Sequence, residues 1–298
     1  RSLEEDLMRR DFTINALAVN DKEEIVDYFG GIEDLEREII RCVGNPMERF
    51  NEDALRMMRA VRFAGQLGFS IESDTFNAIR TLKANLERVA VERMKVEFEK
   101  MILSPHRALA FQAFVESELY HSCPDFKEAK ETLLKLGEFL LEKLTITQAW
   151  ILFAYYERLS IPQLRKVLKN WKSSNDQIST ILTGCQTLRA RLEKEWDAFL
   201  AYECPEVLAI EVEQLLPGIG HSEQLVELEK VYQQLPIRSM KDIQIDGFGV
   251  KEALGLEKMG PIIGEVLQAL QTEILSGRLP NENAEIVSWI RNNFNESK

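Results

Sequence analysis

The sequence predicts a mainly α-helical protein that begins with a short segment of mixed strand and helix character. Residues 1–43 contain brief apolar runs, whereas the spacing of apolar residues after Pro46 is helical to the end of the chain. Prolines then divide the middle of the chain into short helices, at Pro124, Pro162, Pro205 and Pro217. The 298 residues, of which 45% are apolar and 29% charged, suffice for a large core or for two to three small domains.

The balance of charge and the cysteine pattern limit the possible functions. A net charge of −12 disfavours loose, nonspecific binding to nucleic acid, although local stripes of Lys and Arg can still contact phosphates. The four cysteines include no C-x-x-C pair, which argues against a zinc site, and their wide spacing fits reduced thiols in a cytoplasmic protein. No apolar run approaches the roughly 20 residues that span a membrane, so a membrane is not an expected partner.

The first 43 residues supply the strand candidates. Residues 14–19 form a short apolar run, and residues 25–29 predict a strand that ends at the Gly30-Gly31 turn. Residues 39–43 are a further strand candidate. So few strands cannot form a stable sheet without further partners.

The next sixty residues predict a series of helices with recognisable ends. Asn51 is a candidate N-cap for a helix that begins at Glu52, and Gly68 is a candidate C-terminal residue for it. Three further helices are expected over residues 73–86, 91–103 and 106–118.

The Glu52 helix carries an unusual row of charge. Four residues at a spacing of three fall in an inclined row on one helix face, namely Asp53, Arg56, Arg59 and Arg62. The opposite face is apolar and can pack, through Ala54, Met57, Met58, Val61 and Ala64. A carboxylate beside guanidinium groups suits a nucleotide, because the acid accepts from an exocyclic amine while arginines pair with base acceptors and phosphates. The alternative is a solvated helix with i,i+3 ion pairs.

The rest of the chain offers weaker signals. Arg165, Lys169 and Lys172 share a helix face, which is either a phosphate-binding stripe or an ordinary solvated face. The aromatic residues Trp150, Phe153 and Trp171 are expected in the core. Gly260-Pro261 predicts a helix start, whose free N–H groups could also hold an anion.

Four motifs in this order resemble those of the class II tRNA nucleotidyltransferases, the family of bacterial CCA-adding enzymes and poly(A) polymerases. They read RRDFTINALA at residues 9–18, DYFGGIEDL at 27–35, EDALRMMRAVR at 52–62 and VERMKVE at 91–97. The resemblance is strong over the first hundred residues and looser beyond them.

The resemblance implies a mainly α fold: the remnant of an α/β nucleotidyltransferase palm, followed by a helical neck, body and tail. Residues 1–43 would be the C-terminal part of the catalytic head, or palm, domain. Residues 44–105 would form the neck that recognises the base, residues 106–234 the body, and residues 235–298 a tail that contacts tRNA.

The family's first motif, an Asp-x-Asp pair that holds two magnesium ions, is expected upstream of Arg9 and occurs nowhere in this sequence. We therefore expect a fragment, one half of a split protein, or a chain lacking its first part. Its catalytic residues and its Mg²⁺ ligands would lie in that missing segment, so we expect neither among these 298 residues. A two-metal site needs clustered carboxylates to clamp the attacking and leaving oxygens.

The resemblance also assigns roles to residues. Asp53 and Arg56 would pair with the edge of ATP or CTP, and Arg59 and Arg62 would extend that surface towards the triphosphate. Arg10 would contact the nucleotide. Two further residues of the second motif would support the ribose or the loop, namely Asp11 and Asn15.

The fifth motif, which braces the neck in this family, is matched by Glu92, Arg93 and Glu97. Arg93 and Glu97 stand four residues apart, so we expect a structural ion pair between them.

The expected activity is template-independent transfer of CMP and AMP from CTP and ATP to the 3′ end of tRNA. A poly(A) polymerase and an enzyme that adds only CC or only A remain open as alternatives within the family. Outside it, the alternatives are a noncatalytic helical RNA-binding subunit and a helical scaffold. The sequence predicts no oligomeric state.

Overall fold

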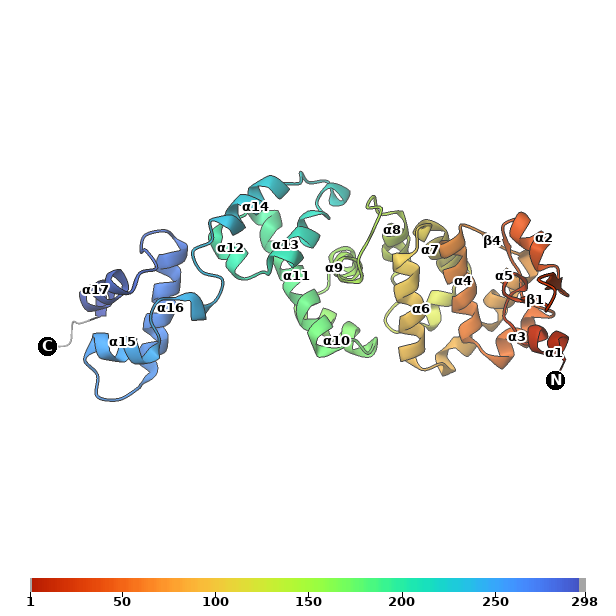
Figure 1. Ribbon diagram of the computed structural model, residues 1–298, viewed down its shortest axis with the longest axis horizontal. Coiled ribbons are helices and arrows are strands. Elements are labelled where there is room, and N and C mark those ends of the chain that lie inside the picture. The colour runs from red at the N-terminus through yellow and green to blue at the C-terminus, as the bar shows by residue number, and fades with distance from the viewer. Residues whose placement is uncertain (1, 295–298) are drawn as a thin grey trace. The chain divides into compact units, whose positions relative to one another are not determined.

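The computed structural model describes residues 2–294 and confirms a mainly helical protein (Figure 1). The chain divides into two compact units, residues 1–185 and 186–298. The proposed boundaries at residues 43, 105 and 234 between head, neck, body and tail stay predictions. No helix among the described residues is long and apolar enough to cross a membrane.

The first unit begins with short elements. Its helices and strands up to residue 88 are α1 (Leu3–Met8), the 3₁₀ turn η1 (Thr13–Asn15), β1 (Leu17–Val19), β2 (Ile25–Asp27), α2 (Gly31–Glu36), β3 (Ile39–Ile40), α3 (Pro46–Glu52), α4 (Leu55–Leu67), β4 (Ser70–Ile71), α5 (Ser73–Leu82) and η2 (Lys83–Arg88). The strand expected over residues 39–43 is shorter than predicted, and the helix expected to reach residue 86 ends at Leu82 and continues as the 3₁₀ turn η2.

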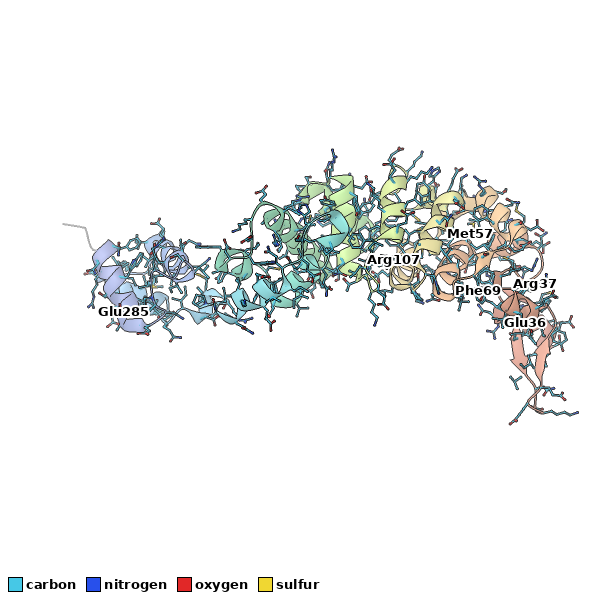
Figure 2. The ribbon with its side chains drawn as sticks, turned by 90° about the horizontal axis from the view of Figure 1, so that it is seen from above. Glu36, Arg37, Met57, Phe69, Arg107 and Glu285 are labelled. Atoms are coloured by element: carbon cyan, nitrogen blue, oxygen red, sulfur yellow. The ribbon has the colours of Figure 1, made fainter. Side chains whose placement is uncertain are left out.

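The strands pair in twos. β1 and β2 form an antiparallel hairpin, and β3 pairs in parallel with β4, a strand that the sequence did not reveal. Figure 2 shows the hairpin projecting away from the helices of this unit. Its outer residues Val19 and Ile25 are 67% and 60% exposed.

Longer helices complete the first unit: α6 (Val91–Leu103), α7 (Arg107–Glu116), η3 (Leu119–Ser122), α8 (Lys130–Glu138), α9 (Ile146–Glu157), α10 (Ile161–Asn170) and α11 (Asn175–Glu193), which continues into the second unit. The helix expected from residue 106 begins one residue later and ends at Glu116. Capping boxes fix the starts of α9 and α10, because Thr145 and Ser160 each exchange hydrogen bonds with the residue three positions on.

The core of the first unit lies where α4 packs against α6 and α7. The apolar face predicted for α4 is buried through Met57, Met58, Val61 and Ala64. Phe98 of α6 lies within 5.0–5.7 Å, between ring centroids, of Phe126, Trp150 and Trp171. Together with the burial of Phe153, this confirms that the predicted aromatic residues belong to the core.

The second unit contains α12 (Ala198–Tyr202), α13 (Glu206–Glu213), η4 (Pro217–Ile219), α14 (Leu225–Gln233), η5 (Met240–Asp242), α15 (Gly247–Leu254), α16 (Pro261–Leu275) and α17 (Asn283–Phe294). The helix start predicted at Gly260-Pro261 is confirmed, with Gly260 as N-cap. Residues of α15, α16 and α17 share one core that includes Val250, Val266, Leu270 and Ile286.

Candidate nucleotide-binding site

The chain breaks its helix at Asp53, so the predicted start at Asn51 is wrong. Asn51 lies inside α3, which begins at Asn45-Pro46 with the Asn45 side chain accepting from the Met47 N–H. Asp53 has extended backbone (φ −148°, ψ 104°) and ends α3. Its Oδ1 accepts from the Leu55 N–H at 3.1 Å, which satisfies a free donor at the start of α4.

Only the arginines of the predicted row therefore lie on one helix. Arg56, Arg59 and Arg62 follow one another at a spacing of three along α4, while Asp53 stands just before it. The exposed fractions of the arginine side chains are 18%, 32% and 7%, and that of Asp53 is 34%. The row is thus open at Asp53 and Arg59 and closed at Arg62.

Arg56 joins α4 to α3 and to Arg9, the residue that ends α1. Its Nη2 donates to the carbonyl of Arg9 at 3.0 Å, and its Nη1 donates to the Arg49 carbonyl and the Glu52 carboxylate. The carbonyl of Arg9 belongs to the RRDFTINALA motif, residues 9–18, and that of Arg49 belongs to α3. Arg56 therefore bonds both segments to the start of α4.

Arg59 connects α4 to the RRDFTINALA motif, residues 9–18. Its Nε donates to Asp11 Oδ2, and the other oxygen of Asp11 accepts from the Asn15 side chain at 3.2 Å. Asp11 is buried, and Asn15 is half-buried. Arg10, by contrast, extends into solvent with 55% of its side chain exposed, and its nearest acid is Asp6 at 3.8 Å.

Arg62 is buried in an ion pair, and this corrects the pairing predicted for the fifth motif. Arg62 Nε donates to Glu97 Oε2 at 2.6 Å, and Arg59 Nη1 lies 3.8 Å from Glu97 Oε1. Phe63 lies beneath this cluster, with the Arg62 guanidinium 4.3 Å from its ring centroid and Phe12 packed edge-on. Such contacts hold a guanidinium in place without neutralising it.

Arg93 likewise pairs with another element and not with Glu97. Its Nη2 donates to Asp53 Oδ2 at 2.9 Å. Spacing along one helix suggested a local pair, but acids and bases on neighbouring elements offer each side chain a better partner. Glu92, the remaining residue matched to this motif, is exposed.

The sequence analysis missed that α6 carries charges complementary to those at Asp53 and on α4. α6 presents Arg93 and then Glu97, one turn apart, to a surface that presents Asp53 and then Arg62. The opposite order of charges in residues 52–62 (EDALRMMRAVR) and residues 91–97 (VERMKVE) was a signal that could have indicated this pairing.

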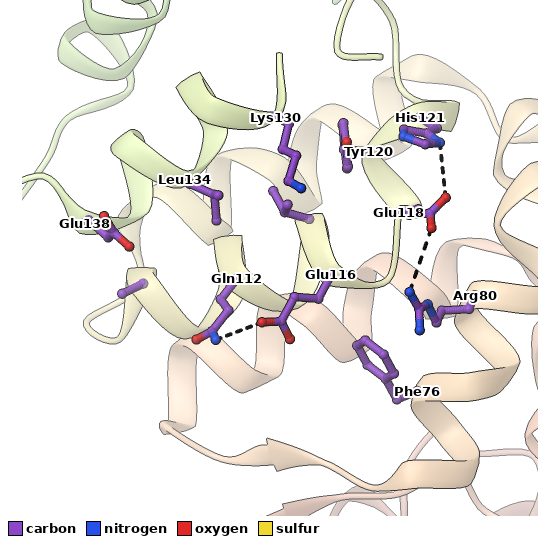
Figure 3. A pocket seen from close by; sticks show the side chains of 12 residues that line it. Phe76, Arg80, Gln112, Glu116, Glu118, Tyr120, His121, Lys130, Leu134 and Glu138 are labelled. Carbon is purple, nitrogen blue, oxygen red and sulfur yellow. Dashed lines mark hydrogen bonds and ion pairs between the residues drawn. The ribbon is translucent and has the colours of Figure 1, made fainter. Parts of the chain in front are cut away.

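A cavity in the first unit lies away from these residues. A cavity of about 970 Å³ is lined by residues of α5, α7 and α8 and of the turn between α7 and α8 (Figure 3). Glu118 accepts there from Lys83 at 3.2 Å and faces Arg80 and His121. The Lys83 and Arg80 cations lower the pKa of the Glu118 carboxyl. None of the predicted nucleotide-binding residues lines this cavity.

The weaker signals of the sequence have mixed outcomes. Arg165 and Lys169 are exposed on α10, but Lys172 lies beyond the end of that helix with φ 58°. Their role in binding phosphate stays a prediction. Among residues 2–294, no group of three or more His, Cys, Asp or Glu side chains is placed to hold a metal ion.

Three family models match the chain. Residues 1–41 match a poly(A) polymerase head domain, residues 68–130 match a probable RNA- and SrmB-binding site of polymerase A, and residues 142–290 match a tRNA nucleotidyltransferase domain 2.

Named relatives agree over nearly the whole length. The CCA-adding enzyme of Ligilactobacillus salivarius is 40% identical over 288 residues, which is 96% of this chain and 71% of the relative. That of Enterococcus faecalis is 39% identical, over 98% of this chain and 72% of the relative. The crystal structure of the Bacillus stearothermophilus CCA-adding enzyme in complex with CTP superposes with a TM-score of 0.89 at 32% identity, covering 98% of this chain and 74% of that one. The order of motifs, the helical fold and these relatives together place the chain in the class II family of CCA-adding tRNA nucleotidyltransferases.

Proposed function

We propose that the protein extends the 3′ end of tRNA by CMP, CMP and AMP, taken from CTP and ATP without a nucleic-acid template. Supporting this are curated relatives of about 40% identity that are named CCA-adding enzymes and the likeness to a CCA-adding enzyme that holds CTP. A cytoplasmic location fits this role, because the four cysteines are buried, reduced thiols.

In the transfer, the 3′ hydroxyl oxygen of the RNA forms a bond to the α-phosphorus of the nucleotide. The bond from that phosphorus to the oxygen bridging the α- and β-phosphates breaks, pyrophosphate leaves, and the hydroxyl proton passes to solvent. In this family magnesium would stabilise the developing charge. Among residues 2–294, no group of three or more carboxylates is placed to hold it.

The observation that supports base reading is that the one-third-exposed Asp53 stands directly before α4, with Arg56 and Arg59 in the first two turns of that helix. Asp53 can accept from the exocyclic amino group of adenine or cytosine, while Arg56 donates to the neighbouring ring acceptor. Uracil and guanine present these groups in the wrong order and leave a polar group unpaired, at a cost of about 1–3 kcal/mol. We infer that this surface admits A and C and rejects U and G.

The arginines would divide the remaining work. Arg56 keeps N–H groups beyond the three hydrogen bonds that it makes to Arg9, Arg49 and Glu52. Arg59 is one-third exposed and would meet the triphosphate, together with the exposed Arg10. Arg62 would contribute its positive charge from below the surface, because its side chain is buried against Glu97. Asp11 and Asn15 would hold the loop.

Equilibrium titration of the chain with CTP, ATP, UTP and GTP tests the base reading. We expect CTP and ATP to bind more tightly than UTP and GTP, and Asp53→Asn to reduce the preference. Asp21→Asn, a charge-matched change at an exposed position, should leave it unchanged. Equal binding of all four nucleotides would contradict the proposed site.

A transfer assay on tRNA lacking its CCA end separates the remaining alternatives. It needs a protein that also carries the family's Asp-x-Asp motif, because that motif does not occur in these 298 residues. Incorporation of two CMP and one AMP supports the proposal. Long runs of AMP would indicate a poly(A) polymerase, and binding of tRNA without nucleotide preference would indicate a noncatalytic RNA-binding subunit.

A further inference from the structure

We propose that Arg93 is a positioning residue that sets base selectivity by holding the Asp53 carboxylate in its reading orientation. This inference rests on the proposed function, since it concerns how Asp53 distinguishes one base from another. Arg93 itself is not required to touch the nucleotide.

Both oxygens of Asp53 are held from different directions. Oδ1 accepts from the Leu55 N–H at 3.1 Å, and Oδ2 accepts from Arg93 Nη2 at 2.9 Å. The first donor is backbone of α4, and the second comes from the first turn of α6. Two bonds from two elements fix the rotation of a carboxylate about its terminal torsion, which is otherwise broad.

The fixed carboxylate remains able to act. Each ionised oxygen can accept about two hydrogen bonds, so one site on each oxygen is still free. About a third of the Asp53 side chain is exposed, which leaves that edge open to an incoming amino group. A base that offers a carbonyl there would place one acceptor against another, and the held carboxylate could not rotate to relieve this. The restricted rotation therefore raises the selectivity for bases with an amino group.

Arg93 can hold this position because α6 itself is anchored. One turn further along the same helix, Glu97 forms the buried pair with Arg62 of α4. Phe98, the next residue, packs in the aromatic cluster of the core. The backbone of Arg93 is therefore fixed relative to α4, the helix that supplies the Leu55 N–H donor.

A purely structural role is a poor account of the Arg93–Asp53 pair. The Arg93 side chain is 53% exposed, and exposed ion pairs add about 0–1 kcal/mol to stability. Removing Arg93 should thus leave the free energy of unfolding almost unchanged. A positioning role, by contrast, predicts a clear change in selectivity, so the two can be measured apart.

The test compares Kd for CTP and for UTP in the full chain and in five variants: Arg93→Met, Arg93→Lys, Asp53→Asn, the double variant of Arg93→Met with Asp53→Asn, and Arg88→Met. Arg88 is an exposed arginine outside the site, so it controls for the loss of one positive charge. Thermal unfolding of each protein reports on stability.

We expect Arg93→Met to lower the preference for CTP over UTP by about tenfold, which corresponds to ~1.4 kcal/mol. Arg93→Lys should recover part of the preference, because lysine keeps the charge but not the planar fork. The double variant should match Asp53→Asn alone, since Arg93 acts through Asp53. Arg88→Met should behave as the parent chain.

Two results would overturn the inference while leaving the proposed function standing. One is a parent-like preference in Arg93→Met when Asp53→Asn has lost it. The other is a further loss in the double variant beyond that of Asp53→Asn, which would show that Arg93 acts independently. A parent chain that binds CTP and UTP equally would instead overturn the proposed site and this inference together.

Discussion

The side chains of Arg62 and Glu97 form an ion pair across the contact between α4 and α6, with Arg62 Nε 2.6 Å from Glu97 Oε2. Only 7% and 5% of the two side chains are exposed. Burial of two charges is costly in itself. It is tolerated because the charges face each other, Arg62 Nη1 also donates to Gln66, and Arg59 Nη1 lies 3.8 Å from Glu97.

Breaking this pair from one side should therefore destabilise the first unit strongly. Arg62→Met leaves Glu97 as a buried charge, and we expect a loss of about 3–5 kcal/mol in the free energy of unfolding. Replacing both residues by methionine should recover much of that loss. Urea unfolding of the two single variants and the double variant measures the coupling, and additive losses would contradict the buried pairing.

Arg107 should be a second point of high sensitivity. Its guanidinium is buried and donates to the carbonyls of Leu136, Phe139 and Leu141, at and beyond the C-terminal end of α8. Burial lowers its pKa, yet the group stays charged at neutral pH because an arginine titrates far above it.

Arg107→Met removes all three donors and should cost about 2–4 kcal/mol, since buried carbonyls would be left without partners. Hydrogen exchange should quicken in residues 137–145 and not in the aromatic core. Arg88→Met serves as the control, with an expected change within about 0.5 kcal/mol. Unchanged exchange after Arg107 is removed would mean that solvent replaces its bonds.

Gly68 ends α4 in the left-handed conformation, with φ 72°. A Cβ added there would lie 3.0 Å from the ring of His106. Gly44, in the same unit, has a similar φ of 66° but open space around the position.

Gly68→Ala should thus cost more than Gly44→Ala, for which the backbone conformation alone predicts about 1–2 kcal/mol. The difference isolates the contact with His106 and should shrink when His106→Ala is added. Thermal unfolding of the four variants measures this. Equal losses at the two glycines would show that the imidazole moves aside freely.

Cys42 should make stability depend on alkaline pH. Its thiol is buried, which raises its pKa from 9.0 to about 12, and the Asp11 carboxylate acts in the same direction. Between these values the folded protein keeps a proton that the unfolded chain loses, so the stability conferred by the neutral thiol falls as pH rises.

We expect the free energy of unfolding to fall by up to about 1.4 kcal/mol per pH unit from this group alone. Cys42→Ala should reduce the slope measured by urea unfolding between pH 9 and 10. An identical slope in that variant would assign the alkaline loss to other groups, such as the buried thiol of Cys123, whose pKa burial also raises.

Local patterns in the sequence predicted much of the helical architecture. Gly68 marked the end of α4, and the apolar spacing of Met57, Met58 and Val61 identified its buried face. The Asn45-Pro46 pair carried an equally good start signal for α3, but the uninterrupted periodicity after it hid the break at Asp53. The periodicity of apolar residues identifies the buried face of a helix well, but it does not reveal a break of one or two residues between helices.

Long-range partners were the part that the sequence did not reveal. Arg93 and Glu97 fit a local i,i+4 pair, and only the placement of α6 beside α4 shows that each has a partner 35 or more residues away. The same holds for Arg59, whose acid partner lies in the second motif. Residue types at the site were thus predictable, whereas the choice among several possible partners depends on tertiary packing.

Arg93 and Glu97 lie one turn apart on α6. The site should therefore be more sensitive to an insertion or deletion between them than to a substitution in the same turn. Inserting a single alanine between them would rotate everything on one side by about 100° relative to the other. Either the arginine or the glutamate would then face away from α4, with every original side chain still present. Homologous chains should therefore tolerate changes of residue type in this turn far better than gains or losses of one residue.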